Sequence, residues 1–199
     1  MLQKIVPKTI AMRAYLVTTV VVTVLMAVIG YMYADTTRQH IFLSQERKLT
    51  EVVTVLDQRL NFDGLMDRFE QAANAADEAT LQATRASLQS VAEEVGQQYP
   101  GFAMGYSAYD NRLAVYPYRP EVFTLPLPLD IEDVYKEKRA LLSHNFKSLV
   151  WNEPSMKIIY PILNDGKMPG YIWSSVPLTR VNSVVYQAWF EIVFILLVA

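Results

Sequence analysis

Hydrophobic and polar positions divide the chain into segments of clearly different kinds. Residues 14–33 form a run of twenty positions without a charge. At about 1.5 Å of rise per residue, a helix of that length spans roughly the 30 Å of a membrane's hydrocarbon core. We therefore expect a first transmembrane helix at residues 14–33. A cleaved secretory signal is the alternative, but the run is longer than the apolar part of such signals, and Met32 stands where a small residue should precede the cut.

Three basic residues and no acidic one precede this segment, namely Lys4, Lys8 and Arg13. By the positive-inside rule, residues 1–13 form a cytoplasmic stub and the chain after Ala34 lies outside the cell membrane. We expect a multi-pass membrane protein, because a second apolar segment follows near residue 199.

The second apolar segment, residues 184–199, contains one charge, Glu191. A carboxylate deep in lipid is costly, so we expect Glu191 at the outer membrane interface beside Trp189. Too few residues then remain before Ala199 to complete a crossing. We interpret residues 184–199 as the start of a second transmembrane helix in a longer protein; a short amphipathic anchor is the alternative.

Residues 34–183 carry fifteen basic and nineteen acidic side chains, and this net charge of −4 suits a solvent-facing domain. Proline divides the domain in two. No proline occurs at residues 35–99, whereas nine of the ten lie at residues 100–177. The first part can therefore form long helices, and the second must consist largely of strands, turns and loops.

In the helical part, apolar residues recur at spacings of 7, 4, 3 and 4, at Phe42, Leu49, Val53, Leu56 and Leu60. This stripe fits either the core face of a helix or the seam of a coiled coil. As a seam, it predicts a homodimer with parallel helices. No glycine or proline interrupts the chain between Tyr31 and Leu60, so one helix should run from the first membrane segment to Leu60. Shorter helices are expected at residues 65–75 and 78–97, the second with Asp77 as its N-cap.

After Pro100–Gly101 the hydrophobic period changes to two, which is typical of strands. A helix is predicted at residues 131–142, and strands at residues 102–109, 112–118, 147–152, 156–163 and 171–176. Asp165–Gly166 provides the positive φ of a two-residue turn, and Gly170 lets the returning strand begin without a side-chain clash. The fold class is α+β, with a long N-terminal helix and a five-stranded antiparallel sheet, flanked by transmembrane helices.

Two stretches of the second part resemble a known family. Pro100–Gly101 with GYSAYDNRLAVYPY (105–118), and MKIIYPILNDGKMPGYIW (156–173), are similar to motifs of extracytoplasmic PAS-like (PDC-type) sensor regions of bacterial two-component sensor histidine kinases. The resemblance implies a PAS-like sensor domain at residues 34–183. It also implies a kinase core beyond this segment that uses ATP and signals to a response regulator.

The strand predicted at residues 112–118 offers one face for binding. Alternation places Leu113, Val115 and Pro117 on the core face, and an arginine with two tyrosines on the other. A guanidinium forms a planar fork for a carboxylate, and phenols add orienting hydrogen bonds. We expect a small anionic ligand, with candidate binding residues Arg112, Tyr116, Tyr118, Arg119, Lys147 and Trp151. Alternatively, the tyrosines simply suit a half-buried strand and the arginine reaches to water.

No catalytic residue, cofactor site or metal site is expected within residues 1–199. The chain has no cysteine and no G-x-G sequence, which excludes thiolate chemistry and glycine-rich phosphate loops. The two histidines, His40 and His144, belong to different elements, although His144 could titrate with the external pH. The overall charge of −2 lacks the basic excess expected of a dedicated nucleic-acid binder, so no nucleic-acid partner is expected. An acidic run is interpreted as a helix cap and a solvated helix face, at Asp130, Glu132 and Asp133.

The sequence thus predicts the signal-sensing and transmembrane-signalling module of a sensor histidine kinase. The same front end serves chemoreceptors and cyclic-nucleotide-signalling receptors, and nothing before Ala199 distinguishes these effectors. A membrane-anchored external enzyme lacks any visible acid–base or nucleophile constellation. A membrane-anchored scaffold that binds a partner through its aromatic face is the remaining alternative.

Overall fold

The chain divides into two units, which are treated separately: Met1–Ile41 with Val184–Ala199, and Phe42–Ser183. A computed structural model describes residues 10–62, 64–74, 77–109, 113–115, 131–148, 153–179, 182–183, 186–187, 190–191 and 194. Side chains are described within these ranges except at residues 11, 144–148 and 153. The segment from Val184, expected to begin a second transmembrane helix, lies mostly outside the described residues.

The first described element is a single helix, α1 (Ile10–Phe62), of 53 residues. The continuous helix expected from residue 14 to Leu60 is therefore confirmed. In the first unit its large apolar side chains are exposed, for example Val20 and Leu25. Among the described residues, α1 is the one helix long and apolar enough to cross a membrane, and none of its most apolar window is buried.

In the second unit, α1 contributes its apolar stripe to the core. Leu49, Val53, Leu56 and Leu60 have no exposed surface within a single chain, and Phe42 is half-buried. Of the two interpretations of the stripe, the core face is therefore the right one. Side chains buried in this way cannot at the same time form the seam of a parallel dimer. The stripe therefore no longer supports the predicted homodimer.

Two further helices follow, α2 (Leu65–Asn74) and α3 (Glu78–Gln98). The carboxylate of Asp77 accepts hydrogen bonds from the backbone N–H groups of Ala79 and Thr80, each at 3.2 Å. The predicted N-cap is confirmed. Both helices bury one side only, which includes Phe69 of α2 and Leu88 of α3.

The sheet has the strand order β2-β1-β5-β4-β3, and all described pairs are antiparallel. Its strands are β1 (Ala103–Ala108), β2 (Ala114–Val115), β3 (Leu141–Ser148), β4 (Glu153–Asn164) and β5 (Lys167–Pro177). Five antiparallel strands were predicted, and the described residues contain five. Between β4 and β5, Asp165 and Gly166 have φ values of 47° and 75°, as a turn with two left-handed residues requires.

One part of the prediction is wrong. The helix expected at residues 131–142 is α4 (Ile131–Glu137), and the strand expected at residues 147–152 begins at Leu141. Lys138 has a φ of 50°, and its N–H donates to the Val134 carbonyl at 2.8 Å, which ends the helix in a left-handed cap. The chain then pairs with β4, so sheet hydrogen bonds override the helix propensity of Ala140, Leu141 and Leu142.

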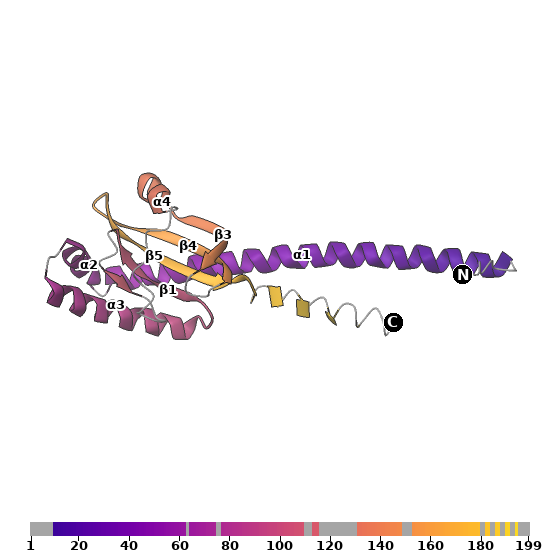
Figure 1. Ribbon diagram of the computed structural model, residues 1–199, viewed down its shortest axis with the longest axis horizontal. Helices are drawn as coiled ribbons and strands as arrows, with labels where there is room; N and C mark the ends of the chain where they lie inside the picture. The colour runs from indigo at the N-terminus through magenta and orange to yellow at the C-terminus, as the bar shows by residue number, and fades with distance from the viewer. Residues whose placement is uncertain are drawn as a thin grey trace. The chain divides into compact units, whose positions relative to one another are not determined.

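The sheet has helices on both faces (Figure 1). One face packs against α2 and α3 and, through Tyr106, against α1. The other carries α4, whose Ile131 and Val134 are buried against it. The first is called the helix-bundle face and the second the α4 face. The strand predicted at residues 112–118 is described only at Ala114–Val115, which pair with β1.

Candidate functional site

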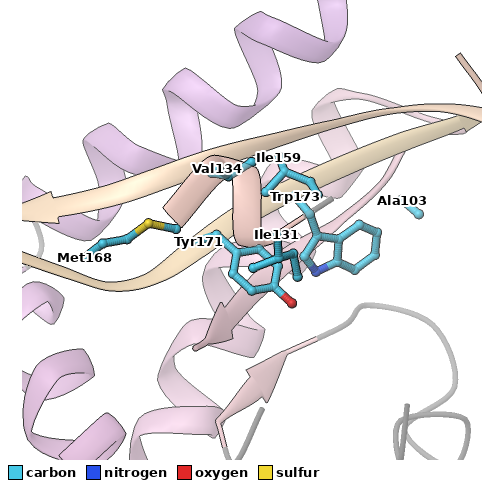
Figure 2. Packing of buried hydrophobic residues seen from close by; sticks show 7 residues of the cluster. All are labelled: Ala103, Ile131, Val134, Ile159, Met168, Tyr171 and Trp173. Carbon is cyan, nitrogen blue, oxygen red and sulfur yellow. The ribbon is translucent and has the colours of Figure 1, made fainter. Parts of the chain in front are cut away.

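The α4 face begins with an apolar cluster near the β4–β5 turn. Ile131 and Val134 of α4 pack there against residues of the sheet (Figure 2), namely Ala103, Ile159, Met168, Tyr171 and Trp173, with Leu141 partly buried beside them. Burial raises the pKa of the Tyr171 phenol, and a side-chain hydrogen bond with Ser107 acts in the opposite direction. This half of the face is a hydrophobic core that fixes α4.

Further along the same strands the face becomes polar. Lys157 of β4 pairs directly with Ser175 of β5 on one side and with Ser143 of β3 on the other. Ser155 lies two residues before Lys157 and therefore on the same face. Lys157 is only 6% exposed, and Ser155 and Ser175 are also buried. These four residues, Lys157, Ser143, Ser155 and Ser175, are called the serine–lysine cluster.

Trp173 joins the two halves of the face. It pairs with Ile159 of β4 and with Gly105 of β1. A Cβ at Gly105 would lie 3.1 Å from the Trp173 indole Nε1 and only 1.9 Å from the Val115 carbonyl oxygen. Glycine at this position therefore makes room for the indole and for the neighbouring strand. The indole N–H, a hydrogen-bond donor, is excluded from solvent near Gly105, on the β1 side of β5.

Most of the predicted ligand residues lie outside the described part of the chain: Arg112, Tyr116, Tyr118, Arg119 and Trp151. Lys147 belongs to β3 and pairs with Pro154, the residue before Ser155, but its side chain is not among those described. The structure therefore does not test whether these six residues meet. Leu113 and Val115, predicted to face the core, are both buried.

Lys157 was missed by sequence reasoning. It stands in the strand MKIIYPIL, where every other residue shares a face, and the alternation puts it on the same side as Ile159. A lysine at an inward position of a buried strand is unusual, and that was the available signal. The sequence alone does not say which face of this strand is covered.

The helix-bundle face ties the sheet to α1. The Tyr106 hydroxyl of β1 donates to the Leu56 carbonyl of α1 at 2.9 Å, in the buried core. On β4, burial raises the pKa of the Tyr160 phenol, and the charge of Asp57 on α1 raises it further. A hydrogen bond to β1 and an electrostatic interaction with β4 therefore link α1 to two strands of the sheet.

Two contacts at the domain surface also hold α1. Arg59 of α1 forms an ion pair with Glu94 of α3. The Tyr99 hydroxyl, just after α3, donates to Glu51 Oε1 at 2.8 Å. These groups are partly or fully exposed, so each contact contributes little by itself.

Other predicted features have simple structural roles. His40 is an exposed residue of α1, and His144 lies in β3 with its side chain outside the description. Asp130 precedes the described part of α4, whereas Glu132 and Asp133 are exposed on it, and Glu132 lies 3.6 Å from Lys136. Among the described residues, no group of three or more His, Asp or Glu side chains converges as a metal site would require.

The comparison with known protein families decides between the alternatives for this domain. Residues 11–183 match the family described as the AtoS N-terminal domain. The chain belongs to this family. The resemblance to sensor regions of histidine kinases is confirmed, and the chain is a sensor domain of the AtoS type.

A relative in Escherichia coli K12, the signal transduction histidine-protein kinase AtoS, is 25% identical over 190 residues. The alignment covers 92% of this chain but 29% of that protein, so the chain spans less than a third of the relative's length.

Two sensor domains are among the solved structures similar to this chain. The ligand-binding domain of the Campylobacter jejuni chemoreceptor Tlp3 in complex with L-valine has a TM-score of 0.41 and 15% identity, covering 75% of this chain and 66% of that one. The Escherichia coli DcuS sensor domain has a TM-score of 0.39 and 15% identity, covering 61% of this chain and 94% of that one.

Proposed function

We propose that this AtoS-type sensor domain is anchored in the cell membrane by α1 and senses a small molecule outside the cytoplasm. The carrying observation is that one unbroken helix contains both the exposed apolar segment and the buried stripe of the sensor core. The apolar segment has the length of a membrane crossing. The positive charges at Lys4, Lys8 and Arg13 favour a cytoplasmic N-terminus, which supports a position of Phe42–Ser183 outside the membrane.

We further propose that the signal passes from the sheet to α1 and then through the membrane. In this proposal a change in the packing of the sheet acts on α1 through its buried apolar stripe and through the hydrogen bond from Tyr106 to Leu56. A continuous helix transmits a displacement more directly than a flexible linker does. The second membrane segment, expected from Val184, would carry the same displacement toward the effector.

The effector in this proposal is a histidine kinase core that uses ATP and passes phosphate to a response regulator. The supporting relative, AtoS, is a signal transduction histidine-protein kinase. A homodimer remains part of the proposal, with a contact other than the buried residues Leu49 to Leu60. The ligand is a small anion, for which Arg112, Tyr116, Tyr118, Arg119, Lys147 and Trp151 remain candidates.

The kinase is tested on the protein that carries this chain, purified in lipid nanodiscs and supplied with labelled ATP. We expect phosphate to appear on a histidine beyond Ala199, in a helix with an H-E/D motif followed by glycine-rich ATP-lid motifs. Replacement of that histidine by alanine should abolish labelling. A downstream sequence with a chemoreceptor or cyclase effector and no phosphohistidine would overturn the kinase proposal, while leaving the sensor domain intact.

A further inference from the structure

We propose that α4 is a lid on the sheet, which turns about Lys138–Ala140 and is held shut by a latch between Tyr109 and Tyr135. Opening of this lid uncovers the apolar cluster of the α4 face and admits small molecules to it. The inference rests on the proposed sensing function, because it supplies the route by which a small molecule reaches the sheet. It concerns a motion of α4 and assigns no ligand-binding residue.

Among the described helices of the second unit, α4 is the least firmly attached. Only two of its seven residues, Ile131 and Val134, are buried, whereas α2 buries four residues and α3 buries five. The other side chains of α4 are exposed. Local opening begins at elements that make few buried apolar contacts. We therefore expect α4 to detach from the sheet while the rest of the unit stays folded.

The two buried side chains of α4 close the apolar cluster. Ile131 and Val134 pack against residues of the sheet, and Figure 2 shows them among the side chains of that cluster. In the same cluster, Ile159 is 2% exposed and Ala103 has no exposed surface. When α4 moves away, these two sheet residues lose the side chains that cover them on this face. The accessibility of Ile159 or Ala103 therefore measures the position of the lid.

The latch joins two tyrosines at the surface. The ring centroids of Tyr109 and Tyr135 lie 4.4 Å apart, with an angle of 37° between the ring planes. Tyr109 is fixed to the sheet, because its N–H donates to the Pro169 carbonyl of β5 at 3.2 Å. Tyr135 belongs to α4, so the ring contact ties the lid to the sheet. Both rings are exposed, and an aromatic pair adds only a modest stabilisation, so the latch can release without unfolding the unit.

The hinge is the link between α4 and β3. Lys138–Ala140 belong to neither element, and all three residues are exposed. Lys138 has a φ of 50°, a left-handed conformation that is unfavourable for a residue with a side chain. Its Nζ donates to the Gly166 carbonyl in the β4–β5 turn, which supports this conformation while the lid is shut. Residues at the end of an element commonly absorb the change in φ and ψ of a hinge, and relief of the strain at Lys138 favours opening.

The test measures how fast iodoacetamide, a small neutral reagent, labels single cysteines in the 199-residue chain in detergent micelles. Ile159→Cys places a thiol on the α4 face, and Ile158→Cys places one on the helix-bundle face of the same strand. The two positions are a matched pair, because both side chains are buried and the chain has no other cysteine. At low reagent concentration, the labelling rate is proportional to the population in which the thiol is exposed. Melting temperatures show which variants fold, and Ala103→Cys, which adds one sulfur atom, takes the place of an Ile159→Cys variant that does not.

We expect Ile159→Cys to be labelled about 10-fold faster than Ile158→Cys or more, because local opening exposes the first thiol and only global unfolding exposes the second. Low concentrations of urea should accelerate the labelling of Ile158→Cys much more than that of Ile159→Cys, since local opening exposes little surface. Tyr135→Ala, which removes the latch ring, should speed up the labelling of Ile159→Cys by about 2–10-fold. Tyr135→Phe keeps the ring and should leave this rate unchanged. Tyr106→Phe should accelerate only Ile158→Cys, because the hydrogen bond of Tyr106 to Leu56 survives when the lid opens.

Three results would overturn the inference. Equal labelling rates for Ile159→Cys and Ile158→Cys, with the same dependence on urea, would show that α4 opens only when the whole unit unfolds. An Ile159→Cys rate that Tyr135→Ala leaves unchanged would remove the latch. Acceleration of Ile159→Cys by Tyr106→Phe would assign the exposure of that thiol to global unfolding. None of these results depends on a ligand or on the kinase assay, so the failure of the lid is distinguishable from the failure of the sensing function.

Discussion

The hydroxyl of Tyr106 donates a 2.9 Å hydrogen bond to the main-chain carbonyl of Leu56, and both residues lie in the buried core. The bond joins strand β1 to helix α1 across fifty positions of sequence. Tyr106 points to the helix-bundle face, while its neighbours Gly105 and Ser107 belong to the α4 face. A single strand thus contacts α1 on one face of the sheet and contributes to the α4 face on the other.

Replacing this hydroxyl should weaken the attachment of the sheet to α1. Tyr106→Phe removes one buried hydrogen bond and leaves the ring, so we expect a loss of about 1 kcal/mol in unfolding free energy. For a chain of this size, that corresponds to about 2–4 °C in melting temperature. Tyr109→Phe, at an exposed tyrosine just after β1, is the control and should change nothing. Equal melting temperatures for all three proteins would contradict the assigned role of Tyr106.

The close approach of Phe69 and β1 to Gly170 should make that glycine irreplaceable. A Cβ at Gly170 would lie 2.3 Å from the Ser107 carbonyl oxygen and 2.7 Å from Phe69 Cζ. Gly170→Ala should therefore destabilise the domain strongly or prevent folding, because a backbone carbonyl cannot move aside cheaply. Gly96→Ala is the matched control in α3, where a Cβ meets nothing within 4 Å. That substitution should stabilise the protein by roughly 0.5–1 kcal/mol, and the same loss in both variants would contradict the packing.

Because the apolar stripe of α1 is buried, cysteines introduced into it should be protected from thiol reagents. The chain has no cysteine of its own, which permits single substitutions. Leu49→Cys and Leu56→Cys should resist a thiol-reactive maleimide in the folded protein and should not cross-link two chains. Thr54→Cys, on the exposed side of the same helix, should react readily. Efficient cross-linking between chains through Leu49→Cys or Leu56→Cys would show that the stripe is a dimer seam after all.

Two aspartates should give opposite pH profiles of stability. Burial raises the pKa of Asp57 above its ordinary value of 3.8, so the folded state disfavours the charged form. Asp57→Asn should be more stable than the wild type at neutral pH. This advantage should shrink as the pH falls through the raised pKa and disappear below 3.8. Unfolding measurements across this pH range provide the test.

Asp77 supplies the contrast. Its hydrogen bonds from the Thr80 hydroxyl and from the N–H groups of Ala79 and Thr80 lower its pKa. Asp77→Ala should therefore be less stable than the wild type at neutral pH, through loss of the cap. The difference should persist down to 3.8 and vanish only as the pH falls through the lowered pKa. The same profile for both aspartates would contradict the assigned environments.

Local signals were read correctly from the sequence. The Asp77 cap and the Asp165–Gly166 turn each depend on two to four neighbouring residues, and the structure confirms both. The predicted end of α4 was wrong because residues 141–143 pair with β4 instead of continuing the helix. This partner strand lies outside the short window on which a helix prediction depends. Local propensity carries no information about that partner.

The candidate site was harder to predict for the same reason. Lys157 lies beside Ser143 and Ser175, which belong to other strands, so this cluster can be recognised only once the sheet register is known. The arginine and tyrosines chosen from the strand at residues 112–118 were neighbours in sequence, and they stay predictions. The stripe from Leu49 to Leu60 was recognised, but a period alone does not distinguish a core face from a dimer seam.

The account's central claim, an external sensor domain on a membrane-anchored helix, is tested most directly by cysteine labelling in spheroplasts. A membrane-impermeant maleimide should label Thr54→Cys in intact spheroplasts, because that side chain is exposed in the sensor domain. Lys4→Cys should be labelled only after the membrane is permeabilised. Labelling of Lys4→Cys in intact spheroplasts, or of Thr54→Cys only after permeabilisation, would contradict the claim.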